Sequence, residues 1–265
     1  MLAWFFCKEK DSHSSSRKDD FVSLASHELR SPLSIIKWYT EILLDGDAGS
    51  LTDDQKKYLT VIQSSNQRAI DLVRSLLNVS RLDLDTFSVS PTNTSLPSVV
   101  RDTIDLFANR AEEKHITITY TEKDTMPPFL VDPHVCQLLI KQLLENAITF
   151  SQQGGAILIE SSVVAHKEIG GKKVDKKSVV ISVTDSGIGI PEKDYAKVFT
   201  KMARGSNVQD SDAHGSGLGL YISKTVANSV GGDVWFTSEE GNGSTFYLTF
   251  PSSGMKKKEG RTVLE

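Results

Sequence analysis

Two hydrophobic heptad repeats, separated by a short polar turn, restrict the fold of this chain more than any other feature. The first repeat spans residues 22–43, the second spans residues 58–79, and the turn DGDAGS (residues 45–50) lies between them. Apolar residues spaced alternately three and four apart line one side of a helix. We therefore expect a hairpin of two helices of about 30 residues, each roughly 45 Å long. The repeat positions are Val22, Ala25, Leu29, Pro32, Ile36, Tyr39 and Leu43, then Tyr58, Ile62, Ser65, Ala69, Leu72, Leu76 and Val79.

Such a hairpin cannot bury both apolar seams by itself. Two copies that pair through these seams form a four-helix bundle, which predicts a homodimer. The start of the second helix is also marked, because Thr52 and Gln55 have the spacing of a capping box. Asp53 and Asp54 place negative charge in the first turn of that helix, where the helix dipole favours it. A coiled-coil spacer without chemistry is the alternative interpretation of this region.

His27 and Glu28 are adjacent in the sequence FVSLASHELRSPL, which spans residues 21–33. The heptad register places His27 outside the seam, so we expect it to be exposed. A neutral imidazole is a nucleophile when a nearby carboxylate accepts its other N–H and fixes the tautomer. Pro32 removes one backbone donor and clashes with the carbonyl of Glu28, so a bend is expected just after the histidine.

A second domain follows the Ser-, Thr- and Pro-rich linker of residues 86–97. Its apolar patterns predict helices and mainly antiparallel strands, an order typical of an α/β sandwich with its helices on one face of the sheet. The expected helices span residues 99–114, 135–150 and 218–230, and the expected strands span residues 115–121, 156–164, 178–185, 234–237 and 244–250.

Short polar and glycine-containing motifs in this second domain have the residue types of a nucleotide site. Asn146 ends the long helix and offers the hard oxygen that Mg²⁺ prefers. Asp185 begins the sequence DSGIGI at a strand end, where it can accept a hydrogen bond from an amine such as adenine N6. Gly187 and Gly189 allow the backbone to approach a ring closely.

Two further glycine motifs follow. GSGLGL (residues 215–220) opens a helix, and N–H groups at a helix start bind anions such as phosphate. A polar stretch precedes this motif, so the strand required by a Rossmann fingerprint is missing. GNGSTF (residues 241–246) forms a tight turn between the last two strands.

HELRSPL, preceded by FVSLAS, closely resembles the phosphoacceptor H-box of sensor histidine kinases. Asn146 and the three glycine motifs resemble, in order and spacing, the N, G1, G2 and G3 boxes of the histidine-kinase catalytic domain. The resemblance covers roughly residues 21–251. It implies an α+β protein in which an N-terminal helical hairpin forms a dimeric four-helix bundle. An α/β sandwich ATP-binding domain follows, with the Bergerat fold that gyrase, Hsp90-type chaperones and mismatch-repair ATPases share.

The resemblance also implies a function: ATP-dependent phosphorylation of His27 and transfer of the phosphoryl group to an aspartate of a response regulator. Glu28 would act as base, Ser31 would position water for a phosphatase activity, and Asn146 would hold Mg²⁺. Residues 199–215 would form the ATP lid, with Arg204 a candidate contact to the γ-phosphate. The nucleotide-binding residues implied are Asn146, Phe150, Asp185, Gly187, Gly189, Arg204, Gly215, Gly217, Leu218, Gly219 and Thr245. The expected divisions are an N-terminal linker (1–15), the dimerisation and phosphotransfer domain (16–90), the catalytic domain (91–252) and a tail (253–265).

Several residues depart from the family pattern. Gln142 replaces an Asn and Thr149 replaces a phosphate-contacting Lys. Met202 and Ala203 stand where the lid usually has two aromatic residues. A charge-assisted hydrogen bond is worth about 1.5–3 kcal/mol, so Thr149 is expected to weaken nucleotide binding or slow phosphotransfer, and Lys201 or Arg204 are candidates to compensate. These departures keep open a nucleotide-binding dimeric scaffold with weak or no phosphotransfer. An ATP-driven conformational clamp is a further alternative, although it has no use for a His-Glu pair on a bundle.

Composition narrows the partners and the compartment. The net charge of −4 lacks the basic excess of a nucleic-acid-binding protein. Cys7 and Cys136 have no disulfide or metal spacing, which fits a reducing cytosol. No apolar run reaches the roughly 18–20 residues of a membrane span. Residues 2–7 are apolar, as in either a frayed terminus or the end of a truncated span. We expect a cytoplasmic chain, with inner-membrane anchoring only through a segment that is absent here.

Overall fold

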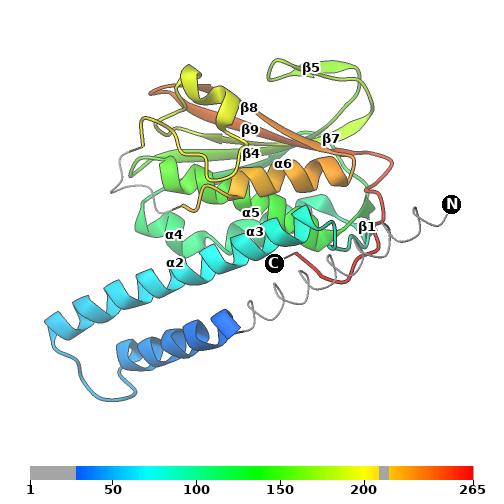
Figure 1. The fold of residues 1–265 in the computed structure, drawn as a ribbon. Helices are drawn as coiled ribbons and strands as arrows, with labels where there is room; N and C mark the ends of the chain where they lie inside the picture. Colours follow the sequence, from blue (N-terminus) through cyan, green and yellow to red (C-terminus); the bar gives the residue numbers. More distant parts are fainter. Residues whose placement is uncertain (1–27, 209–214, 265) are drawn as a thin grey trace, which may run out of the picture. The chain divides into compact units, whose positions relative to one another are not determined.

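The computed structural model describes residues 28–208 and 215–264. The chain divides into two compact units, Met1–Thr86 and Phe87–Glu265, which are described separately (Figure 1). The boundary lies at the start of the predicted linker (residues 86–97), four residues before the expected division after residue 90. Among the described residues, no helix is both long enough and apolar enough to cross a membrane.

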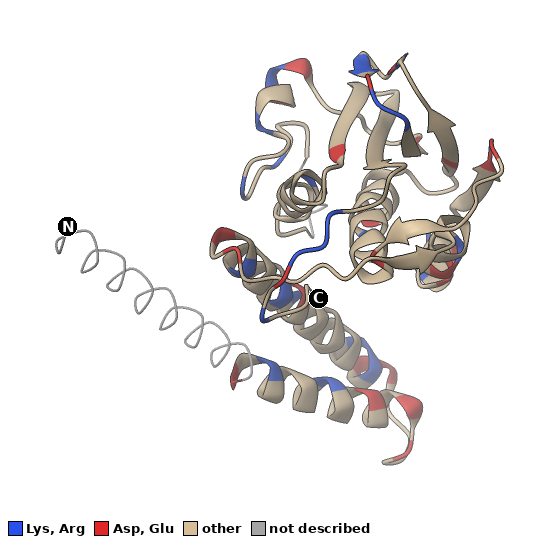
Figure 2. Cartoon of the chain, turned by 90° about the vertical axis from the view of Figure 1, so that its right-hand side faces the viewer, with Lys and Arg blue, Asp and Glu red and all other residues tan. Residues whose placement is uncertain are grey.

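The first unit contains two helices joined by a turn. Residues 28–45 are helical, and α2 spans Asp53–Asp83. The predicted capping box is confirmed, because the Gln55 N–H donates to Thr52 Oγ1 (3.3 Å) and the Thr52 N–H donates to Gln55 Oε1 (2.9 Å). Asn66 Nδ2 on α2 donates to the Leu33 carbonyl (2.8 Å), which joins the two helices. Figure 2 shows acidic residues gathered near the turn and both signs of charge along the helices.

The second unit is built on a five-stranded sheet in the order β2-β4-β7-β9-β8. β2 runs parallel to β4, and every other neighbouring pair is antiparallel, so the sheet is mixed. The elements are β1 (Thr92–Thr94), α3 (Leu96–Asp105), α4 (Ala108–Glu113), β2 (Thr117–Glu122), β3 (Phe129–Val131), α5 (Pro133–Phe150), β4 (Ala156–Val164), β5 (Lys167–Ile169), β6 (Lys172–Val174), β7 (Ser178–Asp185), the 3-10 helix η1 (Glu192–Lys197), α6 (Gly219–Ser229), β8 (Asp233–Glu239) and β9 (Gly243–Pro251).

The helices α3, α5 and α6 lie on one side of this sheet, as Figure 1 shows. Helix α5 packs against β7 and β9, and α3 and α6 pack against α5. Leu139, Leu143 and Leu144 on α5 are fully buried, as is Ile181 on β7. Because side chains alternate along a strand, one face of each central strand lines this core and the other face does not. The α+β class and the one-sided placement of the helices agree with the sequence prediction.

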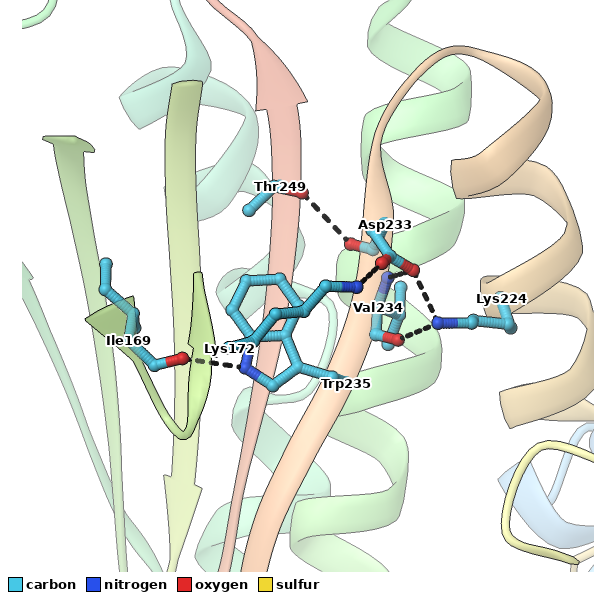
Figure 3. A network of polar contacts seen from close by, with 7 residues as sticks. All are labelled: Ile169, Lys172, Lys224, Asp233, Val234, Trp235 and Thr249. Atoms are coloured by element: carbon cyan, nitrogen blue, oxygen red, sulfur yellow. Dashed lines mark hydrogen bonds and ion pairs between the residues drawn. The ribbon is translucent and has the colours of Figure 1, made fainter. Parts of the chain in front are cut away.

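The β5–β6 hairpin covers part of the opposite face (Figure 3). Trp235 Nε1 on β8 donates to the carbonyl of Ile169 (3.1 Å). Asp233, also on β8, accepts hydrogen bonds from both Lys172 and Lys224. Burial lowers the pKa of Lys224, and the Lys172 charge lowers it further. A small buried cluster forms beneath the hairpin, made of Val164, Val174, Val180 and Trp235.

Three local features differ from the prediction. The helix expected over residues 99–114 is broken into α3 and α4, and at the break Phe107 is buried with non-helical dihedral angles. His115 does not begin a strand, because its φ of 53° is left-handed backbone, and β2 starts at Thr117. Strand β1 forms inside the predicted linker, where it pairs with β3.

The C-terminal residues pair with the start of the second unit. Val89 and Lys258 exchange backbone hydrogen bonds of 2.9 and 3.0 Å, and the Ser88 N–H donates to the Thr262 carbonyl (2.8 Å). The Met255 N–H donates to the Leu130 carbonyl (2.8 Å), and the Met255 side chain is buried. Residues 255–262 are therefore packed onto the domain at these positions.

Candidate functional site

The predicted phosphoacceptor, His27, lies outside the described residues. Glu28 and Ser31 begin the described part of the first helix, and both are exposed. Pro32 lies inside the helix of residues 28–45, so the helix continues through the proline. The bend after the histidine stays a prediction.

Helix α5 carries two of the predicted nucleotide-site residues, Asn146 and Phe150, in its last turns, where both are half-buried. The helix begins at an N-cap formed by Asp132, whose Oδ1 accepts the N–H groups of His134 (2.9 Å) and Val135 (3.2 Å). Lys114 Nζ donates to the carbonyls of Ile148 and Thr149 (both 2.9 Å) at its other end. A cation there satisfies carbonyls that lack helical partners.

The end of α5 is joined to the DSGIGI loop, called here the adenine loop (residues 185–190). The Ile188 N–H donates to the Phe150 carbonyl (3.3 Å), and Ser151 and Gly187 form a β-bridge. A Cβ added to Gly187 would lie 2.4 Å from the Phe150 carbonyl oxygen, so only glycine fits at this position. The motif therefore holds the predicted magnesium-binding helix end against the predicted adenine site.

Asp185 is the last residue of β7, and its side chain is 7% exposed. Its Oδ1 accepts the Gly187 N–H (2.8 Å), and the Ser244 N–H also donates to this carboxylate. Burial raises the pKa of Asp185 to about 6, although both N–H donors act in the opposite direction. At neutral pH the carboxylate is ionised and acceptor-only, as recognition of an amine requires.

Thr245, which the sequence motif suggested as a ligand contact, is not brought to Asp185. Its hydroxyl lies 3.0 Å from that of Thr184, on the sheet face opposite the Asp185 side chain. Ser244 is the residue paired with Asp185 across β7 and β9, and sequence reasoning missed it. Only the register of these two strands could have distinguished the two hydroxyl residues.

The GSGLGL motif (residues 215–220), called here the phosphate loop, leads into α6. Helix α6 begins at Gly219, and its N-cap residue, Leu218, makes no side-chain cap hydrogen bond. Leu218 is 1% exposed and anchors the loop in the core. N–H groups at such a helix start are donors for anions. A Cβ added to Gly219 would lie 2.2 Å from Gln142 Oε1, so the departure at Gln142 lies directly against this helix start.

Arg204 lies next to the phosphate loop and is exposed. Its Nη2 donates to the Gly215 carbonyl (3.2 Å). Two residues earlier, Met202 has a φ of 58° and its side chain is 65% exposed. A Cβ added to Gly217 would lie 2.7 Å from the Met202 carbonyl carbon. The backbone at Met202 therefore packs closely on the phosphate loop, although the aromatic side chain typical of the family is missing.

Comparisons with known proteins identify both units. Residues 131–254 match the family described as "Histidine kinase-, DNA gyrase B-, and HSP90-like ATPase". Residues 17–85 match the family described as "His Kinase A (phospho-acceptor) domain". The chain belongs to the sensor histidine kinases. The ATPase-like domain implies that ATP is its nucleotide.

Relatives in this family are similar along most of the chain. Sensor histidine kinase WalK of Bacillus subtilis (strain 168) is 32% identical over 232 residues, which cover 88% of this chain and 36% of WalK. The structure of full-length ShkA with AMPPNP is 25% identical with a TM-score of 0.68, covering 91% of this chain and 47% of ShkA. That of histidine kinase ThkA with the response regulator protein TrrA has a TM-score of 0.58 at 21% identity, covering 95% of this chain and 66% of ThkA, which shows a shared fold. The chain thus spans about a third of the length of WalK.

Proposed function

We propose that this chain is an ATP-dependent protein-histidine kinase core that phosphorylates His27 and passes the phosphoryl group to an aspartate of a response regulator. The observation that carries the proposal is the joining of Asp185 to the end of α5 through Gly187. It occurs in a chain whose residues 17–85 match a phospho-acceptor domain. A nucleotide site and an acceptor histidine in one chain are what self-phosphorylation requires.

The second unit would bind the nucleotide through groups of distinct chemistry. The ionised Asp185 carboxylate accepts a hydrogen bond from adenine N6, while the N–H groups at the start of α6 and the Arg204 guanidinium face phosphate oxygens. Within the described residues, no cluster of three or more His, Cys, Asp or Glu side chains could hold a metal. Asn146 offers one amide oxygen, which suits Mg²⁺ shared with phosphates and water. When bound, Mg²⁺ would neutralise negative charge on the phosphates.

The reaction transfers the γ-phosphoryl group of ATP first to His27 and then to an aspartate of the response regulator. His27 Nε2 attacks the γ-phosphorus, the P–N bond forms, and the bond to the bridging oxygen breaks to release ADP. Glu28 accepts the hydrogen bond from Nδ1–H and stabilises the cation that forms. In the second step an aspartate oxygen of the response regulator attacks the phosphorus, and the P–N bond breaks. Ser31 supplies a hydroxyl that can position water for the opposing dephosphorylation.

The first unit supports a homodimer as the acting form. Heptad residues on both helices are exposed in the single chain, among them Tyr39 (56%), Tyr58 (65%) and Ile62 (46%). An exposed apolar seam of this kind marks an association surface, and a second copy supplies the same seam for a four-helix bundle. The ThkA–TrrA complex makes a response regulator the partner expected beside this bundle.

The test is phosphorylation with γ-labelled ATP and Mg²⁺. We expect label on the protein that is stable in base and labile in acid, is absent from His27→Gln, and moves to a response regulator. Retention of label in His27→Gln would refute the acceptor assignment. A wild-type chain that binds ATP and dimerises without acquiring label would support the alternative, a nucleotide-binding scaffold motivated by Gln142, Thr149 and Met202.

A further inference from the structure

Residues 202–207, called here the bridge segment, connect the two loops of the nucleotide site. At its first end the segment packs on the phosphate loop, through the close approach of Gly217 to Met202 and through the hydrogen bond from Arg204 to the Gly215 carbonyl. At its other end it contacts the adenine loop. This one short segment thus contacts both the phosphate loop and the adenine loop.

Asn207 makes the contact with the adenine loop. Its Nδ2 donates to the carbonyl of Gly189 (3.1 Å) and, at longer range, to that of Ile188 (3.5 Å). These acceptors are themselves held, because the Gly241 N–H donates to Ile188 (2.8 Å) and the Ile190 N–H donates to Ser238 Oγ (2.8 Å). The Asn207 amide is therefore anchored on a loop that is tied to the end of β8.

Asp194 provides a second, independent anchor, at Ser206, the residue before Asn207. Its Oδ2 accepts the Ser206 N–H at 2.6 Å, and its Oδ1 pairs with Lys197 Nζ at 2.9 Å. The Asp194 side chain is buried in η1, 4% exposed. The hydrogen bond from the Ser206 N–H and, to a smaller extent, the one from Lys197 hold the pKa of Asp194 well below its usual range. The Asp194 carboxylate is therefore ionised at physiological pH.

We propose that Asn207 and Asp194 are positioning residues that set the reach of Arg204 toward the γ-phosphate. Asp194 holds the segment at Ser206, two residues after Arg204, and Asn207 holds it one residue further on. Together they fix the backbone from which the Arg204 side chain extends. Arg204 is exposed, and its guanidinium donates to the Gly215 carbonyl. Its position in space thus depends on how the bridge segment is anchored. This inference rests on the proposed kinase function and assigns that function two residues outside the recognised boxes.

If Asn207 and Asp194 only stabilise the domain, or if they position Arg204, the affinities for nucleotides with and without a γ-phosphate should change differently. An anchor that only stabilises the domain affects ADP and ATP alike. An anchor that positions Arg204 affects only ligands that carry the γ-phosphate. The two roles can therefore be separated by the ratio of the ADP affinity to the affinity for AMPPNP, a non-hydrolysed ATP analogue.

The experiment compares Asn207→Asp with the wild-type full chain. The substitution preserves shape but replaces the donating amide with an acceptor. The Gly189 carbonyl then loses the Asn207 donor, and the Ile188 carbonyl keeps only the Gly241 N–H. We expect the AMPPNP affinity and the rate of labelling from γ-labelled ATP to fall about tenfold or more, the fold-change of one charged hydrogen bond, with the ADP affinity within about twofold. Asn93→Ala, on the exposed strand β1, is the matched control and should match wild type in all three measurements.

A double-mutant cycle with Arg204→Ala tests whether Asn207 acts through the arginine. If it does, Asn207→Asp adds less than about twofold to the loss already caused by Arg204→Ala. Asp194→Ala should give the same γ-phosphate-selective loss, and Asp194→Asn, which keeps an oxygen for the Ser206 N–H, should restore part of it. Equal losses for ADP and AMPPNP, wild-type values for Asn207→Asp, or additive effects with Arg204→Ala would overturn the proposal.

The outcome separates this inference from the proposed function. If the wild-type chain acquires no label, the kinase assignment fails, whereas the ADP and AMPPNP affinities still decide whether Asn207 positions Arg204. If the wild-type chain is labelled and Asn207→Asp is labelled at the same rate, the kinase assignment stands and the positioning role fails.

Discussion

Helices α2 and α5 are both amphipathic, yet they bury their apolar side chains to different extents. On α5, Leu139, Leu143 and Leu144 are fully buried beneath the sheet, while on α2, Tyr58 and Ile62 are 65% and 46% exposed. The second unit supplies its own partners for α5 from strands and helices of the same chain. The first unit leaves part of its heptad seam without cover within its described residues. Catalytic-domain stability is thus a property of one chain, and stability of the hairpin is expected to depend on a second copy.

The largest expected effect comes from a core substitution in the second unit. Leu143→Ala should lower the free energy of unfolding of that unit by about 2–5 kcal/mol, because it leaves a cavity in a closed core. The matched substitution Leu76→Ala, at a 44% exposed position of α2, should cost under about 1 kcal/mol at protein concentrations where the chain is monomeric. Urea denaturation checks both, and equal costs for the two variants would contradict the comparison.

A charge on the exposed seam should instead disrupt association. Ile62→Asp places a carboxylate at a heptad position that the proposed bundle buries, and we expect the dimer dissociation constant to rise about 100-fold, or roughly 2.7 kcal/mol. Sedimentation equilibrium across a range of concentrations measures it. Asp102→Asn, an exposed change of charge on α3, is the control. An unchanged dissociation constant for Ile62→Asp would place the dimer interface elsewhere.

Asp185 should make both stability and nucleotide binding depend on pH, in opposite directions. Burial raises its pKa to about 6, so the folded chain binds this proton more tightly than the unfolded chain. The free energy of unfolding should therefore fall as pH rises from about 4 to about 6, by about 2 kcal/mol in total. Nucleotide affinity should fall as pH drops below about 6, because the ionised carboxylate is the acceptor.

Asp185→Asn provides the reference for both measurements. The difference between its unfolding free energy and that of wild type should vary from pH 4 through about pH 6 and become constant above about pH 7. ADP titration calorimetry should show weak, pH-independent binding for the variant. A constant stability difference across this range would show that the carboxyl group titrates normally.

The smallest expected effects compare one helix cap from each unit. Thr52 is an exposed cap that accepts one N–H, and Thr52→Ala should cost about 0.5 kcal/mol. Asp132 is buried and accepts three N–H groups, including that of Ser90 (2.7 Å), so Asp132→Ala should cost about 2 kcal/mol. Thermal unfolding of both variants checks the order. A larger loss of unfolding free energy for Thr52→Ala than for Asp132→Ala would contradict the expectation that the buried cap contributes more.

Local patterns in the sequence were enough to predict most of the elements. The strands over residues 156–164 and 178–185 have the predicted bounds, and the capping box at Thr52 forms as expected. These features depend on side-chain periodicity and on hydrogen bonds between residues three apart. Strands β1 and β3 are short and escaped prediction, since each is stabilised by a partner more than 30 residues away.

The nucleotide site shows the same division. Asp185 and Gly187 were predicted from one motif and do lie in hydrogen-bond contact. The choice between Ser244 and Thr245 required the register of β7 and β9, because a shift of one residue moves a side chain to the other face. Asn207 gave no signal, since an asparagine in a polar loop is ordinary and its acceptors lie 18 and 19 residues earlier.

The sequence by itself determined most of the helices and strands, and it indicated which glycine motifs are expected to surround a nucleotide, because periodicity, capping and glycine spacing act over a few residues. Only the tertiary structure decided which groups meet: Ser244 with Asp185, Gln142 with Gly219, and Asn207 with the adenine loop. Those contacts depend on strand register and on the packing of α5 against the sheet. Both arise from burial of apolar surface by the whole domain, which no local stretch of sequence encodes.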